Sequence, residues 1–248
     1  MIKFFRKIRY DLMEKNKTGK YLKYAFGEII LVVIGILIAL QINNWNEKQK
    51  LNAKTQEYYV QLLDDLKSDI VFSKQTIEES NAYLKEYERY TNAYNKKDVL
   101  TPIQVFEQIS KLTLIATPLT FNTSTFESLQ STGDIGLIPS NIRNRLIDLK
   151  RLQNLTIKRF EDTDNGKNDI TQKLVLLLGS TTLPNRLANQ PEMKEFLNID
   201  GNLKELILVF EGLHRWKSIS LQESKGRLEE MQKDIDTIMK LINKDLKK

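Results

Sequence analysis

Hydrophobic residues recur at alternating steps of three and four over three long stretches of the chain. In the first stretch, eight of eleven such positions are apolar or aromatic: Tyr59, Leu63, Leu66, Ile70, Ile77, Leu84, Tyr87 and Tyr94, interrupted by Ser73, Ser80 and Thr91. The same spacing returns over residues 142–177 and, most regularly, over residues 203–242. This spacing places the apolar residues on one side of an α-helix, so it predicts three long helices that each bury one stripe.

Turn and capping residues indicate where the helices begin and end. Thr101 followed by Pro102 is typical of a helix start, and we expect a shorter helix over about 102–115. Ser124 and Glu127 have the spacing of a capping box, and Gly133 is a natural helix stop. Pro139 and Ser140 then open the third helix, and residues 179–191 form a loop. The polar middle of the third helix leaves open whether it breaks near Gly166.

A different pattern precedes these helices. Residues 29–40 are twelve consecutive apolar or small residues, and no residue from Ile29 to Asn46 is charged. As a helix, this uncharged stretch is about 27 Å long, close to the thickness of the hydrocarbon core of a membrane. Aromatic residues that favour the membrane interface flank it, namely Tyr21, Tyr24 and Trp45. The pattern therefore predicts a transmembrane helix over residues 20–46.

Two alternatives explain the apolar stretch less well. A buried core helix would leave the basic and aromatic flanks without a role. A cleaved signal peptide usually has a shorter leader than the 28 residues that precede Ile29, and no small-x-small cleavage site follows Leu40. We therefore expect the segment to remain attached as a signal anchor.

The distribution of charge predicts the orientation of this helix. The chain has 248 residues and a net charge of +6, but residues 1–28 alone hold eight bases and three acids, a net charge of +5. The remaining residues hold 30 bases and 29 acids, so no folded basic face is expected and nucleic acid is not a predicted partner. The positive-inside rule places the N-terminus in the cytoplasm and residues 47–248 outside it. Met1, Phe5, Ile8 and Leu12 share one side of residues 1–19, which predicts a basic amphipathic segment on the inner leaflet.

The predicted span carries two further features. Gly27, Leu31, Gly35 and Ala39 recur every four residues on one face, where small side chains let a second helix approach closely. This face predicts self-association, although glycine is also common in ordinary membrane helices. Glu28 lies at the membrane interface, where it reaches water or pairs with a nearby lysine, and an ion-related role is the less favoured alternative.

Few residues indicate chemistry. The chain has no cysteine and one histidine, His214, which falls on the apolar stripe of the last helix and is expected to be a packing residue. Residues 161–169 resemble a calcium loop only faintly, because Gln172 stands where the bidentate acid belongs. The acidic residues Asp64, Asp65 and Asp69 give no assignable acid–base pair. We therefore predict no catalytic residue, no cofactor and no metal site.

Four tyrosines repeat along one side of the first long helix. Tyr83, Tyr87, Tyr90 and Tyr94 lie near the end that is distal to the predicted span. Tyrosine combines a large contact area with a polar tip, so the row is a candidate partner surface. Packing against the loop at residues 179–201 is the favoured alternative.

The first fifty residues also carry a resemblance. The stretch YAFGEIILVVIGILIALQINNWNE resembles the opening of single-pass proteins from Bacteroidota, the domain-of-unknown-function family 6090, and STFESLQSTGDIGLIPSNIRNRLIDL at residues 124–149 is a weaker match. The resemblance implies an anchor in the inner membrane of a Gram-negative envelope. It supplies no reaction and no site residues.

These observations together predict an all-α protein in which one N-terminal transmembrane helix precedes an elongated up-down bundle of long, coiled-coil-like helices. Four legs of about 50, 40, 40 and 46 residues form the bundle at residues 47–248. The favoured function is non-enzymatic: an inner-membrane anchor that presents a periplasmic bundle to membrane lipid, to another envelope protein or to a second copy of itself. The alternative is a periplasmic ligand-binding sensor that acts through a partner protein. A small-molecule ligand is compatible with the sequence, but no motif indicates one, and nothing positive supports an envelope hydrolase.

Overall fold

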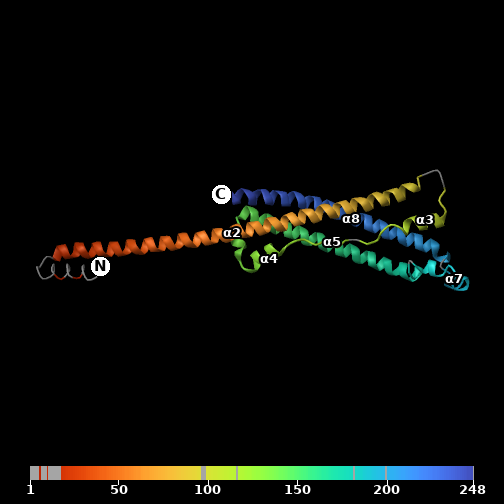
Figure 1. Cartoon of the computed structure of the whole chain (residues 1–248), viewed down its shortest axis with the longest axis horizontal. Helices are drawn as coiled ribbons and strands as arrows, with labels where there is room; N and C mark the ends of the chain where they lie inside the picture. Colours follow the sequence, from red (N-terminus) through yellow and green to blue (C-terminus); the bar gives the residue numbers. More distant parts are fainter. Residues whose placement is uncertain are drawn as a thin grey trace. The chain divides into compact units, whose positions relative to one another are not determined.

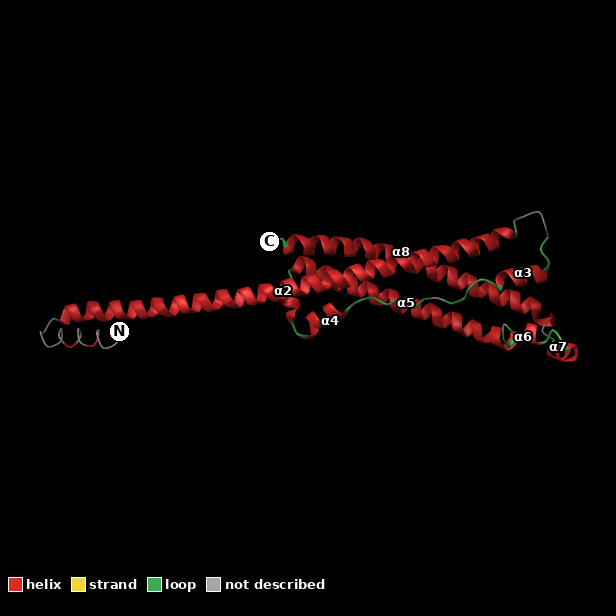
Figure 2. Cartoon of the chain, viewed as in Figure 1, coloured by secondary structure: helices red, strands yellow, loops and turns green. Residues whose placement is uncertain are grey.

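The chain is helical over nearly all of its described length. The computed structural model describes Arg6, Tyr10 and residues 18–95, 99–115, 117–180, 182–198 and 200–247, and these residues form helices and loops without a strand (Figure 2). The long helices are α2 (Thr18–Ala93), α5 (Ser140–Leu178) and α8 (Leu203–Leu246). The short ones are α3 (Pro102–Ile109), α4 (Ser124–Ser131), α6 (Leu183–Arg186) and α7 (Pro191–Leu197), with 3-10 turns η1 (Asp134–Leu137) and η2 (Asp200–Asn202). The predicted all-α class is confirmed.

Two compact units divide the chain, one at Met1–Glu57 and one at Tyr58–Lys248. The boundary between the units falls within α2, between Glu57 and Tyr58. The extracytoplasmic domain was predicted to begin at residue 47. No break interrupts α2, and the sequence holds no Pro or Gly between Gly35 and Thr101. The amphipathic segment expected at residues 1–19 lies almost wholly outside the described residues.

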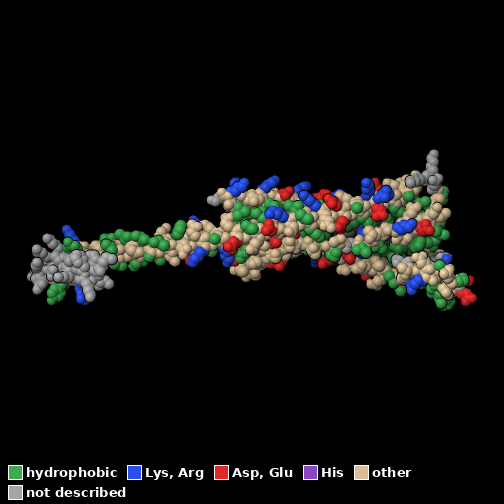
Figure 3. Space-filling model, in the orientation of Figure 1, with side chains coloured by type: hydrophobic (Ala, Val, Ile, Leu, Met, Phe, Trp, Pro, Cys, Tyr) green, Lys and Arg blue, Asp and Glu red, His purple; other side chains and the backbone are tan. Residues whose placement is uncertain are grey.

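The first unit displays its apolar residues. An 18-residue stretch of α2 has a mean hydropathy of 2.5, and none of it is buried among the described residues. Hydrophobic side chains cover the visible face of this stretch in Figure 3, and Ile29, Leu31 and Leu37 are each about 60% exposed. By length and composition it is the one helix of the described residues that can cross a membrane, a test that a signal sequence near the N-terminus also passes.

The second unit is built on three long helices, of which α2 and α5 run in the same direction and α8 runs in the opposite one. Side-chain contacts join Tyr59 to Asp245, Tyr83 to His214 and Tyr90 to Glu211, so α2 and α8 are antiparallel. Asp69 of α2 contacts Gln153 of α5, and α5 packs along α8. The predicted stripes form the interior: ten of the twelve stripe positions on α8 are buried, from Phe210 to Ile242.

The second leg of the bundle differs from the prediction. Instead of a helix to residue 115, α3 ends at Ile109, and residues 110–115 and 117–123 run back along the unit to α4 as a loop, which we call the strap (Figure 1). An extended chain rises about 3.3 Å per residue and a helix 1.5 Å, so fourteen residues span the length of a helix twice as long. The strap is rich in β-branched residues and contains Pro118, which disfavours a helix.

Capping residues fix the short helices at the two ends of the strap. Thr101 forms a capping box with Gln104 at the start of α3, and Gly133 has a φ of 78° after α4, as predicted. The capping box predicted at Ser124 and Glu127 is wrong: Thr123 is the N-cap of α4, its side chain makes no capping bond to the helix backbone, and its hydroxyl donates to the Glu127 carboxylate. Asp65 of α2 instead accepts the Thr125 amide at this helix start, 3.1 Å away. The start of α4 is thereby attached to α2.

Two apolar clusters occupy opposite ends of the unit. One cluster contains Tyr59, Leu66, Leu149, Leu228 and Ile242 among others. The other contains Tyr90, Ile109, Leu174, Leu206 and Phe210 among others. Between them the stripes of all three long helices carry buried polar residues: Ser73, Thr76 and Ser80 on α2, Thr156 and Lys167 on α5, and Lys217 and Ser224 on α8.

Candidate functional site

A cavity of about 590 Å³ lies in the polar middle of the bundle. Its walls are α2, the strap and α8, with one residue of α5, Phe160. The polar lining comprises Thr76, Glu79, Ser80, Tyr83, Glu86, Arg89, Thr113, Thr117, Lys217 and Ser224. This volume lies within the range of pockets that hold small organic molecules. It is therefore the candidate functional site.

Lys217 lines the cavity and holds the strap. The residue is 5% exposed, and its ammonium group donates hydrogen bonds to the backbone carbonyls of Thr113 and Ile115, both at 2.8 Å. The same nitrogen lies 4.0 Å from the centre of the Tyr83 ring. Burial, and secondarily the charge of Lys167, lower the pKa of Lys217 to about 8. Lys217 thus remains mainly protonated at neutral pH, with its donors used within the protein.

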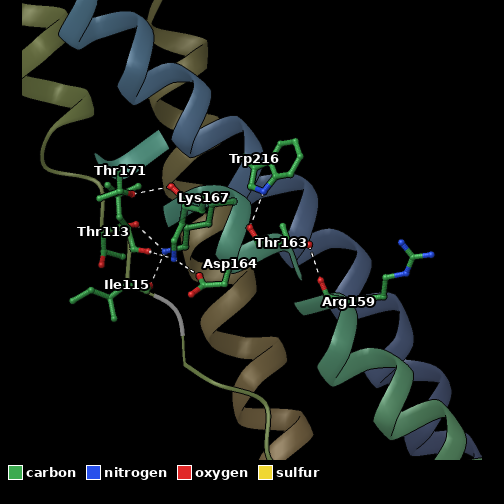
Figure 4. Close-up of polar contacts among 10 residues, drawn as sticks. Thr113, Ile115, Arg159, Thr163, Asp164, Lys167, Thr171 and Trp216 are labelled. Atoms are coloured by element: carbon green, nitrogen blue, oxygen red, sulfur yellow. Dashed lines mark hydrogen bonds and ion pairs between the residues drawn. The ribbon is translucent and has the colours of Figure 1, made fainter. Parts of the chain in front are cut away.

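A second lysine holds the same stretch of the strap from α5. Lys167 donates to the carbonyl of Leu114 at 3.3 Å and forms an ion pair with Asp164 (Figure 4). Two ammonium groups from two helices therefore bind three consecutive carbonyls, those of residues 113–115. The bonds replace the backbone partners that a helix or sheet would give this segment.

Trp216 and Gly166 bring α5 and α8 together beside this site. The indole nitrogen of Trp216 donates to the carbonyl of Thr163 at 2.9 Å (Figure 4). A Cβ on Gly166 would lie 3.2 Å from the Trp216 ring, closer than an ordinary contact. Helix α5 is continuous through Gly166, so the break that the sequence left open does not occur. The absence of a side chain at Gly166 lets the Trp216 ring pack closely against α5.

His214 is a packing residue, as expected. Its side chain is fully buried, and its Nδ1 lies 2.8 Å from the hydroxyl of Tyr83. Burial, and then the nearby charge of Lys217, lower the pKa of His214 to about 4, so the ring is neutral at neutral pH. The Ile109 backbone opposes this shift in part, although no hydrogen bond of ordinary geometry reaches Nε2. No cluster of metal-ligating side chains occurs among the described residues.

The tyrosine row lies mostly inside the unit. Tyr83 and Tyr90 are each 5% exposed, Tyr87 is half-buried and Tyr94 is 48% exposed. The hydroxyls of Tyr90 and Tyr94 both bond to Glu211 of α8. Tyr83 and Tyr90 are therefore packing residues, as the favoured alternative predicted. Their described polar contacts outside α2 are with α8, however, and not with the loop at residues 179–201. A partner contact at Tyr94 stays a prediction.

A separate buried acid lies toward the other end of the bundle. Asp69 is 2% exposed and accepts the Asn122 amide at 2.7 Å and the Gln153 side chain at 2.8 Å. Burial raises the pKa of Asp69 to about 6, although both hydrogen bonds oppose the shift. Asp64 is exposed and bonds only locally, to Lys67. The acidic patch is thus not one site: Asp65 and Asp69 instead hold the strap and the start of α4.

The residues predicted to act in the membrane lie in the first unit. Gly27, Leu31, Gly35 and Ala39 are all exposed, and a Cβ on Gly27 or Gly35 would meet no atom within 4 Å. Tyr24 and Trp45 are exposed and Glu28 is partly exposed. The side chain of Tyr21 lies outside the description. Of the cavity residues, the sequence pattern indicated only Tyr83, as part of the tyrosine row, and the cavity itself was missed. Serines, threonines and lysines on an otherwise apolar stripe were the signal that could have located it.

Comparison with known proteins gives one match. A family of unknown function (DUF6090) matches residues 28–199, which include the apolar part of α2, the strap and α5. No curated protein and no solved structure matches the chain.

Proposed function

We propose that this chain, which belongs to the family of unknown function DUF6090, is a single-pass membrane protein whose helical bundle binds a small molecule. The observation that carries the proposal is the 590 Å³ cavity, whose lining combines hydroxyl, carboxylate and apolar side chains. Ser224 of α8 belongs to this lining and is only 4% exposed. Concave sites that place a few polar groups among apolar side chains are the usual form of small-molecule sites in proteins.

The exposed apolar stretch of α2 supports membrane anchoring. Apolar surface of this extent is unfavourable in water, and no other part of its unit covers it. The excess of bases before the stretch supports a cytoplasmic N-terminus, an inner-membrane location and a periplasmic bundle. Carbonate washing should leave the full-length chain in the membrane, and protease added to spheroplasts should remove the bundle. Release by carbonate, or a cleaved N-terminus, would instead indicate a signal sequence.

Ligand binding is tested with the full-length chain in lipid nanodiscs. We expect the small-molecule fraction of an envelope extract to raise the melting temperature of the bundle by several degrees, because a ligand that binds only the folded state stabilises it. Ser224→Leu places a larger side chain in the cavity and should abolish the increase. Ser218→Ala, at a buried serine of the same helix that does not line the cavity, is the matched control. An unchanged melting temperature of the wild type with every fraction would contradict the proposal.

Self-assembly is the second candidate, and the open face at Gly27 and Gly35 favours it. Small residues along this face allow close helix contact within a membrane. Gly35→Ile should reduce crosslinked dimers in native membranes, whereas Val33→Ile, which lies on the opposite side of the helix at 100° per residue, should not. Equal crosslinking of both variants would remove this face as the interface.

A further inference from the structure

We infer that the cavity takes a neutral, polyhydroxylated ligand of about disaccharide size. The inference rests on the proposed function, because it assigns a ligand class to the same cavity. Three properties of the lining support it: an excess of hydrogen-bond acceptors, a balance of charges with opposite signs, and apolar side chains beside the polar ones.

The acceptors lie on α2. The hydroxyls of Thr76 and Ser80 donate their protons to backbone carbonyls of the same helix, at 2.9 Å and 2.7 Å. Each keeps lone pairs that can accept. Glu79 and Glu86 add carboxylate oxygens; Glu79 accepts from Gln75 and from Thr117, and Glu86 accepts no hydrogen bond from the described residues. A ligand in this cavity must therefore bring several donors of its own.

Donors to the ligand are fewer and lie at separate places. Ser224 is buried on α8, and Arg89 is exposed on α2 near the outer part of the cavity lining. Neither side chain has a hydrogen bond to another described residue. A hydroxyl group of a ligand can accept from Ser224 and donate to an acceptor of α2 at the same time, which an ammonium group or a carboxylate alone cannot do.

The charges disfavour both kinds of ion. The ammonium group of Lys217 lines the cavity and donates to two carbonyls of the strap, so it repels a cation and has less capacity left to bind an anion. Glu79 and Glu86 repel an anion from the side of α2. With Arg89 included, the lining has two bases and two acids, so a neutral ligand avoids the cost of burying an unbalanced charge.

Apolar surface completes the site. Phe160 of α5, Leu119 of the strap and Leu221 of α8 line the same cavity. Sugar rings present C–H groups on their faces and hydroxyls at their edges, so they match a lining in which apolar and polar side chains lie beside each other. The volume of about 590 Å³ leaves room for two such rings.

The test uses saturation-transfer NMR on the full-length chain in phosphatidylcholine nanodiscs, which carry no sugar headgroup or sugar detergent. The neutral probes are maltose, cellobiose, sucrose and di-N-acetylchitobiose, each added alone. Spermidine and glucose 6-phosphate serve as the cationic and anionic comparisons. We expect saturation transfer to at least one disaccharide and to neither ion.

Variants connect any signal to the cavity. Ser224→Ala removes one hydrogen bond and should raise the Kd of the bound disaccharide about threefold to tenfold. Ser224→Leu should abolish binding, and Ser218→Ala should leave the Kd unchanged. A disaccharide signal that survives Ser224→Leu would overturn the inference, because binding would then occur elsewhere.

The outcomes separate the inference from the proposed function. Binding of spermidine or glucose 6-phosphate in place of the disaccharides would overturn the ligand class and leave a ligand-binding bundle. The same holds if no probe binds while the envelope extract still raises the melting temperature in a manner sensitive to Ser224→Leu. If neither the probes nor the extract has an effect, both proposals fail.

Discussion

The hydroxyl of Tyr83 on α2 lies 2.8 Å from Nδ1 of His214 on α8, and both side chains are buried beside the ammonium group of Lys217. Histidine, tyrosine and lysine meet here without a metal-ligating cluster among the described residues. Their contacts join α2, α8 and the strap at the wall of the cavity. The polar middle of the bundle therefore holds these elements together and also forms the candidate binding site. The stability of the bundle and its binding of a ligand can be tested by separate substitutions.

Removal of the Lys217 ammonium group should loosen the strap. Lys217→Met leaves two carbonyls without their charged donor, and we expect the free energy of unfolding to fall by about 2 kcal/mol. This corresponds to roughly 4–8 °C in the melting temperature followed by circular dichroism. Lys240→Met, at an exposed lysine of the same helix, is the control and should change the melting temperature little. Equal effects of the two variants would show that the strap does not depend on Lys217.

Acidification should affect His214 and Asp69 in opposite directions. The pKa of His214 falls from 6.5 to about 4 on folding, so its contribution to stability is present above pH 6.5 and is lost as the pH falls toward 4. The pKa of Asp69 rises from 3.8 to about 6, so its contribution is present below pH 4 and is lost as the pH rises toward 6. In the wild type the two effects largely cancel between pH 4 and 6.

Single variants should reveal each effect. Asp69→Asn leaves His214 alone, so its melting temperature should fall relative to the wild type as the pH decreases from 6 to 4. His214→Gln should show the opposite trend over the same range. The measurement is the difference from the wild type at each pH, because other carboxylates titrate alike in all three proteins. Parallel curves for the three proteins would contradict both assigned shifts.

A Gly→Ala substitution, which stabilises an exposed helix position, should not stabilise the protein at Gly166. In an exposed helix position, Gly→Ala stabilises by up to about 1 kcal/mol, and Gly212→Ala on α8 should show this gain because no atom lies within 4 Å of its Cβ position. Gly166→Ala instead places a methyl group 3.2 Å from the Trp216 ring and should give no gain. A red shift of tryptophan emission should accompany it as the ring moves outward. A gain equal to that at Gly212 would show that the ring contact has no structural weight.

The apolar cluster near the end of α8 should respond in proportion to burial. Leu228 is fully buried, and Leu228→Ala should cost about 3 kcal/mol because it removes buried methyl groups and leaves a cavity. Leu208 on the same helix is 62% exposed, and Leu208→Ala should cost well under 1 kcal/mol. Chemical denaturation of both variants measures the difference. Similar costs at the two positions would show that the stripe of α8 was assigned to the wrong side.

The sequence predicted the long helices well because their stripes and caps are local signals. Leu203 at the start of α8, Pro139 before α5 and the helix start at Thr101 and Pro102 follow from a few adjacent residues. The strap was mistaken for a helical leg because its hydrogen bonds come from Lys167 and Lys217, which lie 50 to 100 residues further along the chain. No local pattern reveals such partners. The cavity was missed for the same reason, since its lining comes from four separate segments.

The way the strap is fastened also bears on how this protein can change over evolutionary time. Lys167 and Lys217 donate hydrogen bonds to backbone carbonyl oxygens, which every amino acid possesses. The amino acids at residues 113–115 can therefore be substituted as long as the backbone keeps its path. The two lysines have no such freedom, because no other described side chain donates to these three carbonyls. We therefore expect related chains to vary most in the very segment that covers the cavity, and in this way to alter what it admits without rebuilding the frame around it.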